Sequence, residues 1–130
     1  GKKGKSEDKK KKDEEKKNEE KRKKEDEKRR KEEAKFKAFR KRLQEIERQL
    51  KEDLKAIDAQ YEEASQQITI QLERNYLSKG DSAPDEAFSP KVLEQREVTR
   101  EYRAAREQIQ SAIAQLQPKI EAAILREERA

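Results

Sequence analysis

The sequence predicts an all-α protein: a long antiparallel helical hairpin, coiled-coil-like, with a highly charged N-terminal arm that is helical or disordered. Large apolar residues recur every three or four positions through residues 34–78, with no Gly or Pro between them. The same spacing returns in residues 90–130, and a stretch rich in Gly, Asp, Ser and Pro separates the two at residues 79–89. Steps of three and four residues place side chains on one helical face. Two amphipathic helices joined by a loop are therefore expected.

The first helix is expected over residues 34–78, and its apolar stripe defines it. The stripe advances by about 3.6 residues per helical turn, which is typical of a nearly straight helix, whereas a heptad repeat of 3.5 would impose a left-handed supercoil. A hairpin or small bundle is therefore favoured over a long regular two-stranded coiled coil. The stripe residues that we expect to make the interaction face are Phe36, Phe39, Leu43, Ile46, Leu50, Leu54, Ile57, Tyr61, Ile68, Leu72 and Tyr76.

The loop has a signal for each helix end. Gly80 is suited to the residue after a helix, because glycine tolerates the left-handed conformation there. Ser89 can cap the second helix, with Pro90 at its first position, where proline is preferred. Phe88 and Leu93 have the spacing of a hydrophobic staple, which fixes the direction in which the chain enters the helix.

The second helix is expected over residues 90–130. Pro118 lies inside its pattern, removes one backbone hydrogen bond and clashes with the preceding turn. A kink near Pro118 is predicted, and a full break into a third short helix is the alternative. The stripe residues of this helix are Val98, Tyr102, Ile109, Ile113, Leu116 and Ile120.

The two helices match in length, which favours an antiparallel pair. A turn centred at Pro84 places residue 54 opposite about residue 114, and residue 57 opposite about residue 111. Ile109 and Ile113 are then expected to face the region of Leu54. The second helix covers nearly all of the first stripe and ends where the charged arm begins.

The arm, residues 1–33, contains no large apolar residue. It holds 17 Lys or Arg and 12 Asp or Glu, so it carries the whole chain's net charge of +5. Acidic residues often precede basic ones by four positions, and each such pair stabilises a helix by roughly 0.2–0.5 kcal/mol. The arm resembles the single-α-helix spacers of motor and chromatin proteins. Both a solvated helix and a disordered tail are consistent with this composition.

Composition argues against catalysis. The chain has no Cys or His, and charged residues make up 50% of it. A catalytic site needs an enclosed, preorganised pocket, which two thin helices do not provide. We therefore expect no enzyme activity, no cofactor, no metal and no small-molecule ligand. The balanced charge of the amphipathic segments argues against a membrane partner.

The function that these patterns favour is protein–protein interaction, as a structural or scaffold subunit of a larger assembly. The partners would be other protein helices, in a homo-oligomer or a hetero-complex. The composition is compatible with an intracellular protein, and the mixed Lys/Glu arm favours the nucleus over the cytoplasm. The alternative is a nucleic-acid- or ribosome-associated factor, whose phosphate contacts would come from Lys9, Lys10, Lys11, Lys12, Lys23, Lys24, Arg29 and Arg30.

Part of the first stripe resembles a known helix. The run Arg42, Leu43, Ile46, Leu50, Asp53, Leu54, Ile57 and Tyr61 is similar in spacing to the SARAH dimerisation helix of Hippo-pathway kinases and their adaptors. Most of this similarity is ordinary helical periodicity, and here the chain continues into a second helix. No function is transferred from it.

Overall fold

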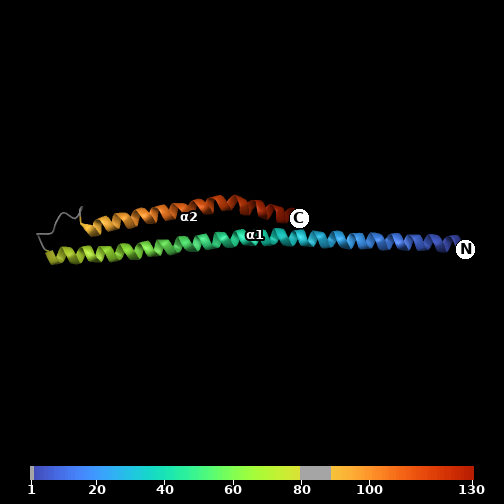
Figure 1. Cartoon of the computed structure of the whole chain (residues 1–130), viewed down its shortest axis with the longest axis horizontal. Helices are drawn as coiled ribbons and strands as arrows, with labels where there is room; N and C mark the ends of the chain where they lie inside the picture. Colours follow the sequence, from blue (N-terminus) through green and yellow to red (C-terminus); the bar gives the residue numbers. More distant parts are fainter. Residues whose placement is uncertain (1, 80–88) are drawn as a thin grey trace. The chain divides into compact units, whose positions relative to one another are not determined.

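The computed structural model describes the backbone of residues 2–79 and 89–130 as two long helices packed against each other (Figure 1). Helix α1 spans Lys2–Lys79 and helix α2 spans Pro90–Arg129. The described part of the chain contains no strand. The predicted all-α helical hairpin is confirmed.

Helix α1 runs without interruption through the charged arm. Of the two alternatives for residues 1–33, the helix is the one that the structure contains, from Lys2 onward. The described side chains of the arm, residues 6–33, are exposed to solvent. Two of the ion pairs between residues four apart are formed, with Lys23 Nζ 3.7 Å from Glu19 Oε1 and Lys31 Nζ 3.5 Å from Glu27 Oε1. Local charge pairing, not burial, therefore accompanies helix formation here.

The helix boundaries at the loop agree closely with the sequence. α1 ends at Lys79, one residue later than predicted. At the start of α2, the backbone N–H of Val92 donates to Ser89 Oγ at 3.2 Å, and that of Leu93 donates to the Ser89 carbonyl at 3.1 Å. The predicted serine cap is confirmed, because these are the bonds an N-cap residue makes. The expectations for Gly80, Pro84 and Phe88 lie outside the described residues.

Helix α2 continues through Pro118 to Arg129. The alternative of a full break into a third short helix is wrong. The chain is helical on both sides of Pro118, so one missing N–H does not end the helix. The kink itself stays a prediction.

The chain divides into two compact units. The first contains Gly1–Arg42 together with Glu121–Ala130, and the second is Leu43–Ile120. Each unit takes one segment from α1 and one from α2. Each is described by itself below.

The core is thin in both units. Leu43, Ile68 and Ile120 are buried in the second unit, and Ala123 is buried in the first. No polar or charged side chain of the described residues is buried to the same degree. Two helices shield a stripe from one side only, which explains why so few side chains leave the solvent.

The predicted pairing register of the second unit is wrong by more than one helical turn. Tyr61 stacks on Tyr102, whereas a turn centred at Pro84 would place Tyr61 opposite about residue 107. The helix ends are staggered: α1 extends past the start of α2 at the loop (Figure 1). Tyr76 is accordingly 55% exposed and Leu77 80% exposed. Ile109 still falls opposite Leu54, because both lie seven residues from the stacked tyrosines.

Candidate functional site

The most specific arrangement in the second unit is a polar cluster between the two helices, which we call the tyrosine cluster. Residues on both helices recur in it at steps of three and four, so each helix contributes one face. Its members are Asp58, Tyr61 and Ser65 of α1 and Gln95, Thr99, Tyr102 and Arg106 of α2.

Two stacked rings form the centre of the tyrosine cluster. The ring centroids of Tyr61 and Tyr102 lie 4.1 Å apart and their planes differ by 8°. The Tyr102 hydroxyl donates to Asp58 Oδ1, which also accepts from Arg106 Nε at 3.3 Å. The Tyr61 hydroxyl shares a hydrogen bond with Thr99 Oγ1 at 3.1 Å. Each hydroxyl group thus forms its hydrogen bond with a residue of the other helix.

Gln95 extends the cluster toward the loop end of the second unit. Its Nε2 donates to Ser65 Oγ at 3.0 Å and to Thr99 Oγ1 at 3.2 Å. Its Oε1 is buried and has no hydrogen-bond partner among the described residues. Gln95 therefore links the two helices through its donor side only.

The two tyrosines differ in their electrostatic surroundings. The hydrogen bond to the Asp58 carboxylate raises the pKa of Tyr102, because ionisation would place two negative charges together, and desolvation adds to the effect. The hydrogen bonds from Thr99 and Ser65 lower the pKa of Tyr61, and nearby Arg103 lowers it further. The hydroxyl groups of the two stacked tyrosines thus have pKa shifts of opposite sign.

The cluster's chemistry is that of recognition between helices. Each hydrogen bond joins specific positions, so a slip of one turn would break several bonds at once. Polar groups between helices fix pairing register in coiled coils, and the cluster has the arrangement for that role. No group of three or more His, Cys, Asp or Glu side chains in the described part of the chain is placed to hold a metal ion.

Sequence reasoning found both tyrosines but missed their partners. Asp58, Ser65, Gln95, Thr99 and Arg106 lie beside the apolar stripes, at the same steps of three and four. That spacing was the available signal. The role of each residue depends on which residue of the other helix lies opposite it. The sequence did not establish that pairing register.

The predicted interaction stripe divides by exposure. Leu43, Ile68 and Ile120 are buried, whereas Phe39, Ile46 and Tyr76 stay 41%, 49% and 55% exposed. The remaining members of the stripe are half-buried: Phe36, Leu50, Leu54, Ile57, Tyr61, Leu72, Val98, Tyr102, Ile109, Ile113 and Leu116.

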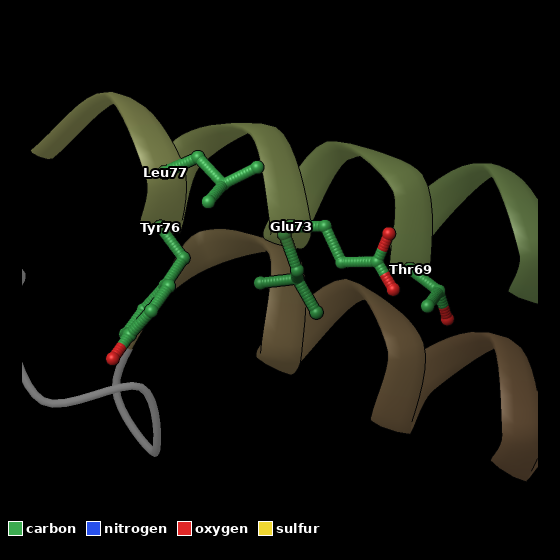
Figure 2. A pocket seen from close by; sticks show the side chains of 5 residues that line it. Thr69, Glu73, Tyr76 and Leu77 are labelled. Carbon is green, nitrogen blue, oxygen red and sulfur yellow. The ribbon is translucent and has the colours of Figure 1, made fainter. Parts of the chain in front are cut away.

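At the loop end of the second unit, the last turns of α1 form a shallow apolar groove (Figure 2). Its lining includes Leu72, Tyr76 and Leu77, with Thr69 and Glu73 beside them. Figure 2 shows Tyr76 and Leu77 on the final turn of α1, with Glu73 and Thr69 on the two turns before it. Tyr76, which belongs to the predicted interaction stripe, lines this open groove.

In the first unit, one ion pair joins the two helices. Arg40 binds Glu127 through two bonds, one from Nε to Oε2 and one from Nη2 to Oε1 at 3.2 Å. Both side chains are mostly shielded from solvent. The bond to Arg40 holds the pKa of the Glu127 carboxyl below its usual value. This pair is the clearest polar contact between the segments of the first unit.

The residues expected to contact phosphate lie on the exposed arm, but they do not share one face. Successive helical residues point about 100° apart, so the side chains of Lys9, Lys10, Lys11 and Lys12 spread around α1. Lys23 is paired with Glu19. Lys24, Arg29 and Arg30 are exposed and also point in different directions.

The described helices include none that is long and apolar enough to cross a membrane. Comparison with protein-family models, with curated proteins and with solved structures found no match to this chain. The helical hairpin and its surfaces are therefore the basis for a functional proposal.

Proposed function

We propose that this protein is a non-enzymatic protein–protein interaction module, a structural or scaffold subunit whose helical hairpin packs against further helices. The half-covered apolar stripe carries this proposal. Phe39, Ile46 and Tyr76 belong to the stripe by sequence, yet each remains at least 41% exposed in the hairpin. Further helices, from a second copy or from another protein, would cover them.

The energetics of burial support this role. Transferring a Leu or Ile side chain fully out of water contributes about 1.5–3 kcal/mol. Most stripe residues of the hairpin are only half-buried, so much of that free energy is not realised in a single pair. Packing of a third or fourth helix realises it, as in a four-helix bundle.

Ile46 provides the sharpest test in the second unit. It lies on the stripe but is 49% exposed, so Ile46→Glu places the new carboxylate in solvent and leaves the hairpin folded. In an assembly, the same carboxylate would be desolvated against apolar neighbours. The matched control is Ala59→Glu, which adds the same charge at an exposed position on the outward side of α1.

The experiment compares the wild-type chain with these two variants. Light scattering measures the mass of the purified chain over a range of concentrations, and affinity capture from a cell extract measures the proteins retained. We expect Ile46→Glu to abolish self-association or partner retention and Ala59→Glu to preserve both, with equal helicity by circular dichroism. Identical behaviour of all three chains would contradict the proposal.

A further inference from the structure

One face of α1 carries a row of lysines that runs along the arm and ends just beyond it. Six lysines of α1 recur at alternating steps of four and three, which keeps them on one side of the helix. We call this row the lysine ridge: Lys17, Lys21, Lys24, Lys28, Lys31 and Lys35. All six are exposed.

The lysines of the ridge form few ion pairs in this structure. Among the described residues, Lys31 is the only ridge member within ion-pair distance of a carboxylate, Glu27 at 3.5 Å. Residues 17–35, which contain the ridge, hold ten basic and seven acidic side chains, a net charge of +3, and the six ridge lysines lie on one face of that segment. At about 1.5 Å per residue, the ridge is about 27 Å long.

The ridge leads directly to an aromatic groove in the same unit. The groove has an apolar floor made by Phe36, Ala38 and Phe39, and its other lining residues are Lys35, Arg42 and Arg126. No carboxylate is part of this lining. Phe39 is 41% exposed, and the Arg42 guanidinium carbon lies 5.9 Å from the centre of its ring. Lys35 belongs to both the ridge and the groove.

We propose that the lysine ridge and the aromatic groove together bind an acidic α-helix of a partner protein. The partner helix carries Glu or Asp at steps of three and four, opposite the ridge, and one large apolar side chain that packs on Phe39. About five helical turns would match the length of the ridge. Arg42 and Arg126 then contact acidic groups beside the apolar side chain.

A helix fits this surface better than a nucleic acid does. Glu20, Glu25, Glu27 and Glu32 flank the ridge on its two sides, one position away from ridge lysines on the helix. A duplex with phosphates on both sides of the contact would bring some of them against these acids. A narrow helix contacts the ridge alone, and its own basic residues can meet the flanking acids. The apolar floor at Phe39 also matches a protein side chain and not a phosphate backbone.

This surface goes beyond the stripe interaction proposed above. It shares Phe39 with the stripe, but its lysines lie in the first unit of the chain, whereas Ile46 and the tyrosine cluster lie in the second. Charge reversal on the ridge therefore leaves stripe-mediated assembly in place, and the two proposals can fail separately.

The test uses the full chain and a synthetic, fluorescently labelled helical peptide of about 25 residues. The peptide carries Glu at alternating steps of three and four and one Trp near its end; a peptide of the same composition in scrambled order and a short DNA duplex are the comparison probes. Fluorescence anisotropy measures affinity at several salt concentrations. We expect binding of the ordered peptide that weakens with salt.

Two double variants separate the ridge from general charge. Lys17→Glu/Lys24→Glu reverses two ridge lysines, and Lys16→Glu/Lys23→Glu reverses their immediate neighbours on another face, with the same spacing and net charge. We expect about a tenfold loss of affinity for the ridge variant and less than about twofold for the control. Phe39→Ala should also weaken binding, with little change in its salt dependence. Circular dichroism checks that each variant stays helical.

Four results would overturn the proposal. One is no binding of the ordered peptide at low salt, and another is equal weakening by the two double variants. The third is tighter binding of the DNA duplex than of the peptide, which would assign the arm to nucleic acid. The fourth is equal binding of the ordered and scrambled peptides, because the spacing would then have no role.

Discussion

Tyr61 and Tyr102 stack with ring centroids 4.1 Å apart, and yet the pKa of Tyr61 is lowered and that of Tyr102 is raised. The difference comes from what each hydroxyl contacts. Tyr102 donates to the Asp58 carboxylate, whereas Tyr61 bonds to the neutral Thr99 hydroxyl. Each hydroxyl contacts a residue of the opposite helix, so the pKa values of the two tyrosines depend on how the helices pair.

Alkaline titration of the two tyrosines should therefore occur in separate steps. In a Tyr76→Phe background, we expect Tyr61 to ionise first and Tyr102 well after it, as measured by tyrosinate absorbance. Asp58→Asn removes the carboxylate that raises the Tyr102 pKa, so the later step should move to lower pH. If both tyrosines ionise in a single step, and Asp58→Asn does not shift that step, the hydroxyl contacts described here are not formed in solution.

Cross-linking should distinguish the observed register from the symmetrical one. The chain has no native cysteine, so introduced pairs are the only thiols. Leu54→Cys/Ile109→Cys places both thiols seven residues from the stacked tyrosines, and we expect a disulfide on mild oxidation. Leu54→Cys/Ala114→Cys matches a turn centred at Pro84 and should form an intramolecular disulfide much more slowly. Gel mobility without reductant gives the two rates, and the reverse order would mean that the register is wrong.

Charge insertion in the middle of the second unit should unfold the hairpin. Leu54 is half-buried in the stripe, and Leu54→Asp would desolvate a carboxylate without a partner, at a cost of several kcal/mol. Total stability is usually about 5–15 kcal/mol, so helicity and assembly should be lost together. The adjacent Lys55→Ala, at an exposed position, should affect neither. If circular dichroism and light scattering find Leu54→Asp unchanged, the stripe is not the interface.

The charged arm should be dispensable for folding of the rest of the chain. Its described side chains are exposed and bury no apolar surface, so deletion of residues 1–33 should leave the thermal midpoint of the remainder nearly unchanged. Calorimetry of the full and shortened chains measures the difference. Loss of cooperative unfolding after the deletion would show that the arm contributes contacts that this structure does not contain.

The Arg40–Glu127 pair should make stability sensitive to acid. The pKa of Glu127 in the folded chain is lower than its ordinary value of 4.5. The pair's contribution is therefore present above that value and is lost as the pH falls through the folded pKa. Glu127→Gln should lower the thermal midpoint at neutral pH. It should also reduce the further fall of the thermal midpoint between neutral and acidic pH. The neighbouring exposed Glu128→Gln is the control, and equal pH profiles for the two variants would argue against the pair.

The sequence by itself determined the two amphipathic helices and the boundaries at the loop between them. Apolar residues at steps of three and four, the long run without Gly or Pro, and the Ser89–Pro90 cap are local signals, and a helix is stabilised by local hydrogen bonds. For that reason the end of α1 and both ends of α2 lie within a residue of the expected bounds, whereas α1 begins at Lys2 and not at residue 34. The helical arm was one of two alternatives, because ion pairs between residues four apart contribute little each, and composition alone did not decide between them.

The tertiary structure decided the register and the tyrosine cluster. Sliding one amphipathic helix along another by one turn keeps apolar residues facing apolar residues, so the stripes alone are compatible with several registers. The choice depends on contacts between residues far apart in the chain, such as Tyr102 with Asp58 and Gln95 with Ser65. The stagger of the two helices also leaves Tyr76 and Leu77 beyond the start of α2, which a symmetrical hairpin would have covered. Those contacts exist only after the helices pair, and their specific side chains, not the periodicity, select one register.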